Sequence, residues 1–258
     1  MTGWLYKEFR HYRLLVLGAL LVPVICIWAP LLMEFLGGLG EQDAPLRHAF
    51  RMMKEQSASY FLMMITALLI FGMLLQAVFN GDEVKKWACF VSSTPNGIKA
   101  FLCAKYLFVL MLCGLFYLSV FWNESLFMTV GYLAYGTELP ALSDFVLMML
   151  LVILLLRAVD YAAIARFGTM FGVKVKGILF VGLWAFGAVW LLFGPLPDDI
   201  DSAVNAVTGF FTKLMTGTYS EQIGLIIGLL PPAALLAYYL SYQLSCKLYM
   251  KGVEHYAK

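Results

Sequence analysis

The sequence predicts an all-α integral membrane protein with six transmembrane helices, an N-terminal interfacial helix and a short external helical hairpin between helices 5 and 6. Composition is the first reason, because 62% of the 258 residues are hydrophobic and 13% are charged, against about 45–50% and about 25% in soluble domains. The mean hydropathy of +0.83 agrees. The second reason is that the apolar residues gather in runs near the length of about 20 residues that a helix needs to cross the hydrocarbon core. We therefore expect a single transmembrane domain over residues 1–258, with short loops and no room for an ATPase domain.

The first segment, residues 1–13, is expected to lie in the headgroup plane as an interfacial helix. It mixes aromatic residues with basic ones such as Lys7 and Arg10, which is a basic amphipathic pattern. The apolar run that follows is too long for a signal-peptide core and no small-residue cleavage site ends it, so we interpret it as the first span. Pro23 and Pro30 lie inside this span and predict a kink, where the freed carbonyls need other partners.

The later spans are also predicted from apolar runs. The third is interrupted at residues 123–125, so either its helix is long or its end is re-entrant, and the sixth has Pro231-Pro232 at its middle. Residues 195–222 have an amphipathic part after an acidic cluster, which we interpret as a hairpin dipping into the outer leaflet. The six predicted spans cover residues 14–36, 57–79, 105–128, 144–165, 177–194 and 223–246.

The distribution of basic residues orients these helices. Six spans place both termini on one side of the membrane, and thirteen of the eighteen Lys and Arg residues fall on that side. Four fall on the other side, and Arg157 lies within the fourth span. Because cytoplasmic loops carry an excess of Lys and Arg, we expect a multi-pass protein of the cell membrane with both termini in the cytoplasm. The thirteen are Lys7, Arg10, Arg13, Lys85, Lys86, Lys99, Lys105, Arg166, Lys174, Lys176, Lys247, Lys251 and Lys258.

Residues 80–105 form a long charged interruption between the second and third spans. Asp82 and Glu83 are expected to open a short helix, since acidic residues suit the positive end of a helix. Basic and aromatic residues follow, as at an interface, and a turn at Pro95 ends this helix. The residues that carry the pattern are Asp82, Glu83, Lys85, Lys86, Trp87 and Pro95.

This order resembles the cytoplasmic loop between the second and third spans of ABC-2 type transporter permeases, the membrane subunits of ATP-driven exporters. That loop carries an acidic pair, a Lys with an aromatic residue, a turn with Pro, and Lys-Tyr where the next helix begins. The matching residues here are Asp82-Glu83, Lys86-Trp87, Pro95 and Lys105-Tyr106. The turn departs from the pattern, because many members have Leu-Pro followed by a basic residue. We call residues 80–105 the coupling loop.

The resemblance implies a permease subunit that forms a homodimer or a heterodimer and is driven by a separate cytoplasmic ATPase. ATP and Mg would be bound by that partner, so we expect no cofactor in this chain. Membrane lipid is the other expected contact, and no nucleic acid is expected. Few charges lie inside the spans, so the expected substrate is an amphipathic or hydrophobic peptide, lipid or drug, moved outward by alternating access. The alternative is a nucleotide-independent secondary transporter or a membrane accessory protein, although no internal repeat supports the former.

No catalytic site or metal site is expected. The three histidines fall in loops or tails, and there is neither an HExxH helix nor a phosphate-binding loop. The five cysteines are scattered and do not suggest a metal site.

Ionisable residues inside apolar sequence are candidates for gating. Arg157 and Asp160 share one face of the fourth span, and the favoured interpretation is an ion pair that neutralises itself, with gating as the alternative. Glu124 lies too far along the third span to reach Arg157, so a solvated outer edge is favoured for it.

A second set of candidates could line a pathway for a bulky apolar substrate. Met64, Phe71 and Leu75 lie on the second span, and Met adapts to irregular shapes. The alternative for each is a place in the packed core or against lipid.

Overall fold

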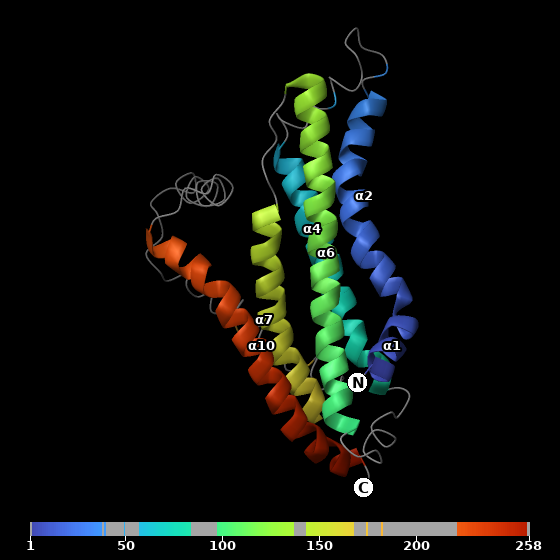
Figure 1. The fold of residues 1–258 in the computed structure, drawn as a ribbon, viewed down its shortest axis with the longest axis vertical. Helices are drawn as coiled ribbons and strands as arrows, with labels where there is room; N and C mark the ends of the chain where they lie inside the picture. Colours follow the sequence, from blue (N-terminus) through green and yellow to red (C-terminus); the bar gives the residue numbers. More distant parts are fainter. Residues whose placement is uncertain are drawn as a thin grey trace. The chain divides into compact units, whose positions relative to one another are not determined.

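The structure, a computed structural model, is helical wherever it describes a regular element (Figure 1). It describes residues 2–37, 39, 49, 57–83, 97–136, 143–167, 174, 182 and 221–256. The helices within these ranges are α1 (Thr2–His11), α2 (Arg13–Gly37), α4 (Ser57–Glu83), α6 (Gly97–Tyr135), α7 (Ser143–Phe167) and α10 (Glu221–Tyr256). The all-α class predicted from the sequence is therefore confirmed for the described part of the chain.

The chain divides into two compact units. Unit 1 comprises Met1–Val78 with Cys103–Ile153, and unit 2 comprises Phe79–Leu102 with Leu154–Lys258. The long helices α6 and α7 each contribute residues to both units. Each unit is described by itself below.

Three of the described helices are long and apolar enough to cross a membrane. They are Arg13–Gly37, Gly97–Leu133 and Ser143–Arg166, and α4 adds a shorter apolar helix, Met63–Val78. The predicted sixth span lies within α10. The predicted fifth span and the external hairpin fall outside the described residues, apart from Gly182 and the start of α10. The structure thus supports several membrane helices, and the count of six remains a prediction.

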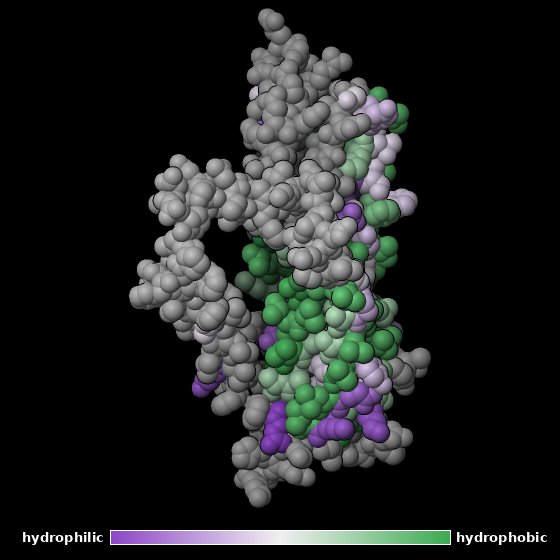
Figure 2. All heavy atoms as spheres, turned by 90° about the vertical axis from the view of Figure 1, so that its left-hand side faces the viewer, coloured by the Kyte–Doolittle hydropathy of each residue, from purple (hydrophilic) through white to green (hydrophobic). Residues whose placement is uncertain are grey.

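Helix α2 packs one face against the rest of unit 1 and exposes an apolar face. Its buried residues recur every four positions, as Ala19, Pro23, Ile27 and Leu31. Leucines such as Leu14 are exposed on the other side, where lipid contact suits them because a bilayer interior is as apolar as leucine. Figure 2 shows hydrophobic side chains (green) over much of the described surface on one face, with hydrophilic ones (purple) gathered toward one end.

The carbonyl of Leu20, near the first α2 proline, has a partner on another helix, whereas the carbonyl that Pro23 leaves without its helical donor is that of Ala19. Proline lacks an N–H and its ring pushes against the preceding turn, so carbonyls there turn outward. Leu20, three residues before Pro23, accepts a hydrogen bond through its carbonyl from Ser119 Oγ of α6 at 2.8 Å. This bond ties α2 to the neighbouring helix α6 within unit 1.

The third predicted span forms one continuous helix, so the long-helix alternative is right and the re-entrant end is wrong. The polar residues that interrupt the apolar run donate to carbonyls one turn back, as Asn123 does to Ser119 and Ser125 does to Phe121, at 2.8 and 2.7 Å. Such bonds satisfy polar groups without leaving the helix. The helix ends at Gly136, whose φ of 63° and N–H bond to the Tyr132 carbonyl at 3.0 Å form a left-handed cap.

Unit 2 joins α10 to the second half of α7. Ser241 Oγ donates a hydrogen bond to the carbonyl of Ala158, and both residues are buried. Pro231 and Pro232 lie inside α10, as the sequence predicts. Near the other end of α10, the rings of Tyr249 and Phe101 have centroids 6.3 Å apart.

The coupling loop differs from its predicted form at both ends. Helix α4 continues to Glu83, so Asp82 and Glu83 lie in its last turn and do not open a new helix. The attraction of acidic residues to a helix start is worth only about 0.3–1 kcal/mol, which is too little to break a helix that has no proline before Pro95. Helix α6 begins at Gly97, directly after the residues predicted to form the turn, so residues 97–105 are helical.

Candidate functional site

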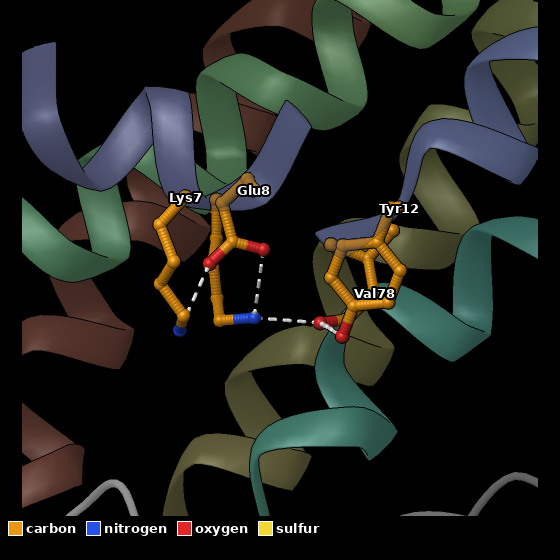
Figure 3. Close-up of polar contacts among 5 residues, drawn as sticks. Lys7, Glu8, Tyr12 and Val78 are labelled. Atoms are coloured by element: carbon orange, nitrogen blue, oxygen red, sulfur yellow. Dashed lines mark hydrogen bonds and ion pairs between the residues drawn. The ribbon is translucent and has the colours of Figure 1, made fainter. Parts of the chain in front are cut away.

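A buried polar cluster in unit 1 joins α1, α4 and α6 (Figure 3) and includes the last residue of the coupling loop, Lys105. We call it the Lys105 cluster. Lys105 is buried on α6, and its Nζ donates to the carbonyl of Val78 on α4 at 2.6 Å. The same carbonyl accepts a second hydrogen bond, from Tyr12 Oη at 3.0 Å. Lys105 Nζ also lies 3.6 Å from Oε2 of Glu8 and 5.8 Å from the centre of the Tyr12 ring. One ammonium group thus connects three helices.

The fold explains why these side chains meet. Glu8 and Tyr12 are four residues apart, which places them on one side of the chain as α1 ends and α2 begins. The chain bends at Tyr12, whose carbonyl accepts the N–H groups of Leu15 and Val16 at 2.9 and 3.1 Å. Phe108, one turn beyond Lys105, packs edge-on against Phe9 with ring centroids 5.1 Å apart. Apolar packing therefore holds the bend against α6 and brings the polar groups together.

Glu8 is the least expected member of the Lys105 cluster. Its side chain is 1% exposed, and it is shared between Lys105 and Lys7, whose Nζ lies 3.3 Å from Oε1. Neither carboxylate oxygen has a hydrogen-bond partner among the described residues. A buried carboxylate in such a setting depends on its ion pairs to remain charged.

Sequence reasoning missed the Lys105 cluster. Lys105 counts in that reasoning as one of thirteen cytoplasmic basic residues and as part of the family pattern, and neither role points to a buried partner. One signal was present, because Glu8 is the only acidic residue among the first thirteen and lies four residues before Tyr12. An acid within a basic amphipathic helix points to a specific cationic partner.

The ion pair predicted between Arg157 and Asp160 of α7 is present in unit 2. Arg157 Nη1 lies 2.7 Å from Oδ2 of Asp160, a charge-assisted hydrogen bond between side chains that are 7% and 13% exposed. The ion-pair interpretation is therefore confirmed in its geometry. A gating role for either residue remains a prediction.

Glu124 is buried, with 4% exposure, so its predicted solvated position is wrong. The reason is that α6 continues beyond it for eleven residues to Tyr135. Glu124 thereby falls on the buried face of α6 that includes Val120 and Phe127. Its neighbour Asn123 accepts a hydrogen bond from Trp28 Nε1 of α2 at 3.0 Å. Polar contacts between α2 and α6 thus continue into this part of unit 1.

The proposed pathway residues fill the core of unit 1. Met64, Phe71 and Leu75 are all buried, and the Phe71 ring stacks on that of Phe116 of α6 with centroids 4.4 Å apart. The packed-core interpretation describes where they lie in this structure. A pathway lined by them stays a prediction.

The coupling residues of the loop are described in part only. Lys85, Lys86, Trp87 and Pro95 lie outside the described residues. For the acidic pair the structure describes the backbone, which forms the last turn of α4. The described residues therefore locate both helices that lead into the loop.

These features define a class: a multi-pass helical membrane protein with buried charged groups. A family model described as ABC-2 family transporter protein matches residues 46–250. The chain therefore belongs to the ABC-2 transporter family, which confirms the resemblance carried by the coupling loop, and it is a membrane transport subunit. No curated protein and no solved structure matches the chain.

Proposed function

We propose that this chain is the permease subunit of an ATP-driven exporter and that its coupling loop docks on a cytoplasmic ABC ATPase. The supporting observation is the bond of 2.6 Å between Lys105 and the Val78 carbonyl, because it ties α4 to α6 next to the loop that connects them. Force applied to the loop would then reach two helices together. The membership of the ABC-2 family supports the same function.

The remaining parts of the function follow from this proposal. The partner ATPase binds ATP and Mg, and a second permease subunit, identical or different, completes the transporter. Nucleotide binding biases the spans between an inward-facing and an outward-facing state. The apolar spans favour an amphipathic or hydrophobic peptide, lipid or drug as substrate. Both termini lie in the cytoplasm, and the buried charges Arg157, Asp160 and Glu124 are the candidates for gating.

Docking is tested by changing the apolar anchor of the loop. Trp87→Ala should weaken ATPase binding by a few kcal/mol at most, roughly the effect of losing one hot-spot residue, while the helices stay folded. Trp122→Ala is the matched control, because Trp122 is exposed on α6 and is predicted to lie toward the other side of the membrane. The measurements are recovery of an ATP-binding cassette protein with the tagged chain, and ATP hydrolysis in reconstituted liposomes.

The acidic pair gives an independent test. Asp82 and Glu83 lie at the end of α4, where lysines would suit the negative end of the helix better. Changing both to Lys should therefore keep the helix and impair docking through lost charge complementarity. If this variant and Trp87→Ala both bind the ATPase and hydrolyse ATP like the parent, the loop is not the docking element. Coupling would then have to be sought in residues 166–176.

A further inference from the structure

We propose that Lys105 is the positioning residue of the coupling loop and that its ion pair with Glu8 makes α1 follow the ends of α4 and α6 when the loop moves. This inference rests on the proposed function, because it concerns how force from the ATPase spreads into the membrane subunit. It adds a role for the N-terminal helix, which contributes no residue to the loop.

The Lys105 cluster lies close to the loop along both helices. Val78 precedes the end of α4 at Glu83 by five residues, and Lys105 follows the start of α6 at Gly97 by eight. At 1.5 Å per residue these separations are about 8 Å and about 12 Å. A helix bends little over so short a length, so a displacement of either loop end is carried to the cluster.

Helix α1 is held at the cluster by charge as well as by packing. The carbonyl of Val78 receives one donor from the α1–α2 bend, Tyr12, and one from α6, Lys105. Glu8 completes the connection through its ion pair with Lys105. Separating α1 from α6 would break the ion pair between Glu8 and Lys105 while both groups stay buried, which is unfavourable. The three helix ends are therefore expected to move together.

The ion pairs of Glu8 are arranged so that they can rearrange, and they do not maximise the stability of the fold. Glu8 is placed between two lysines at similar distances, 3.3 Å for Lys7 and 3.6 Å for Lys105, and its oxygens lack hydrogen bonds among the described residues. Apolar side chains of similar volume would often stabilise such a site at least as well as a buried ion pair. As α1 moves, a carboxylate shared in this way can strengthen its ion pair with one lysine while the ion pair with the other lysine weakens.

The experiment compares four variants in complex with the ATPase. Glu8→Gln and Lys105→Met each remove one charge of the pair, and the double variant removes both. Arg10→Gln is the matched control, because Arg10 is an exposed basic residue in the last turn of the same helix. A fluorophore on a cysteine at Tyr6, which is 67% exposed on α1, reports the motion of the helix. The five native cysteines are replaced first.

The complexes are reconstituted in liposomes of phosphatidylcholine and phosphatidylglycerol, and the change in fluorescence on adding ATP is recorded. The single variants should accumulate less folded protein than the parent, and the double variant should recover it. We expect the double variant to bind the ATPase like the parent while its ATP-dependent fluorescence change falls by about fivefold or more, as for loss of an ordinary coupling free energy. Arg10→Gln should keep the parental change, and a further variant, Lys105→Arg, should recover part of it.

If the ion pair between Glu8 and Lys105 only stabilises the fold, a different result is expected. A folded double variant with the parental fluorescence change overturns the positioning role and leaves the proposed function intact. If the double variant does not accumulate, Glu8→Asp decides, since it keeps the charge and shortens the reach by one methylene. A reduced fluorescence change then supports the inference, and a parental change overturns it. Failure of the proposed function is distinct, because the parent chain would then recover no ATPase.

Discussion

The Arg157–Asp160 pair allows a quantitative prediction. The charged groups lie 2.7 Å apart on side chains that are 7% and 13% exposed, so solvent screens them little. At that distance and an effective dielectric constant of about 20, their attraction is about 6 kcal/mol before the cost of desolvation is subtracted. Removing one partner leaves the other charge buried, so Arg157→Ala or Asp160→Ala alone should lower the free energy of unfolding by about 3–5 kcal/mol.

The double variant should be more stable than either single variant, because it removes both buried charges. The measure is the temperature at which half of the purified protein remains folded in detergent, followed by size-exclusion chromatography. Asp144→Ala is a control on the same helix, since Asp144 is exposed in the first turn of α7, and it should cost about 1 kcal/mol or less. A double variant no more stable than the weaker single variant would refute the argument. A folded double variant that fails in transport would support gating.

Two further predictions concern topology and the end of α6. A cysteine placed at Ser202 should react with an impermeant thiol reagent from outside intact cells and one at Ser93 should not; the reverse result means that the orientation is inverted. Gly136→Ala should lower the free energy of unfolding by about 1–2 kcal/mol, because Gly136 has a φ of 63°. Gly114→Ala, inside α6 with nothing within 4 Å of an added Cβ, should instead stabilise by about 1 kcal/mol. If Gly136→Ala and Gly114→Ala changed the stability equally in thermal unfolding, Gly136 would not act as the left-handed cap of α6.

The apolar runs were sufficient to predict where most described helices lie. The predicted first, second and fourth spans agree with α2, α4 and α7 to within about four residues at each end. This works because a membrane helix must be apolar along most of its length. The α2 and α10 prolines were also placed correctly inside helices, since neighbouring helices can satisfy the backbone groups that proline frees.

The errors have two physical causes: a helix can continue through residues whose charge favours a helix start, and local reasoning neglects what packs on a helix. Asp82 and Glu83 were assigned to a helix start from their charge, although α4 simply continues through them. Glu124 was assigned to solvent from its distance along the third span, although its polar neighbours bond to their own helix and its face is covered. The partnership of Glu8 with Lys105 joins residues 97 positions apart, and no periodicity within one helix reveals it.

Helix α6 has a mechanical consequence that its sequence alone does not suggest. Its 39 residues without a break make a rod of about 58 Å, nearly twice the hydrocarbon thickness of about 30 Å. A rod of that length acts as a lever: a tilt of about 10° around its midpoint would carry each end about 5 Å in opposite directions. The end that begins beside the coupling loop and the end capped by Gly136 therefore cannot move independently. A displacement of α6 at one membrane surface would therefore be transmitted to the other surface through one continuous helix.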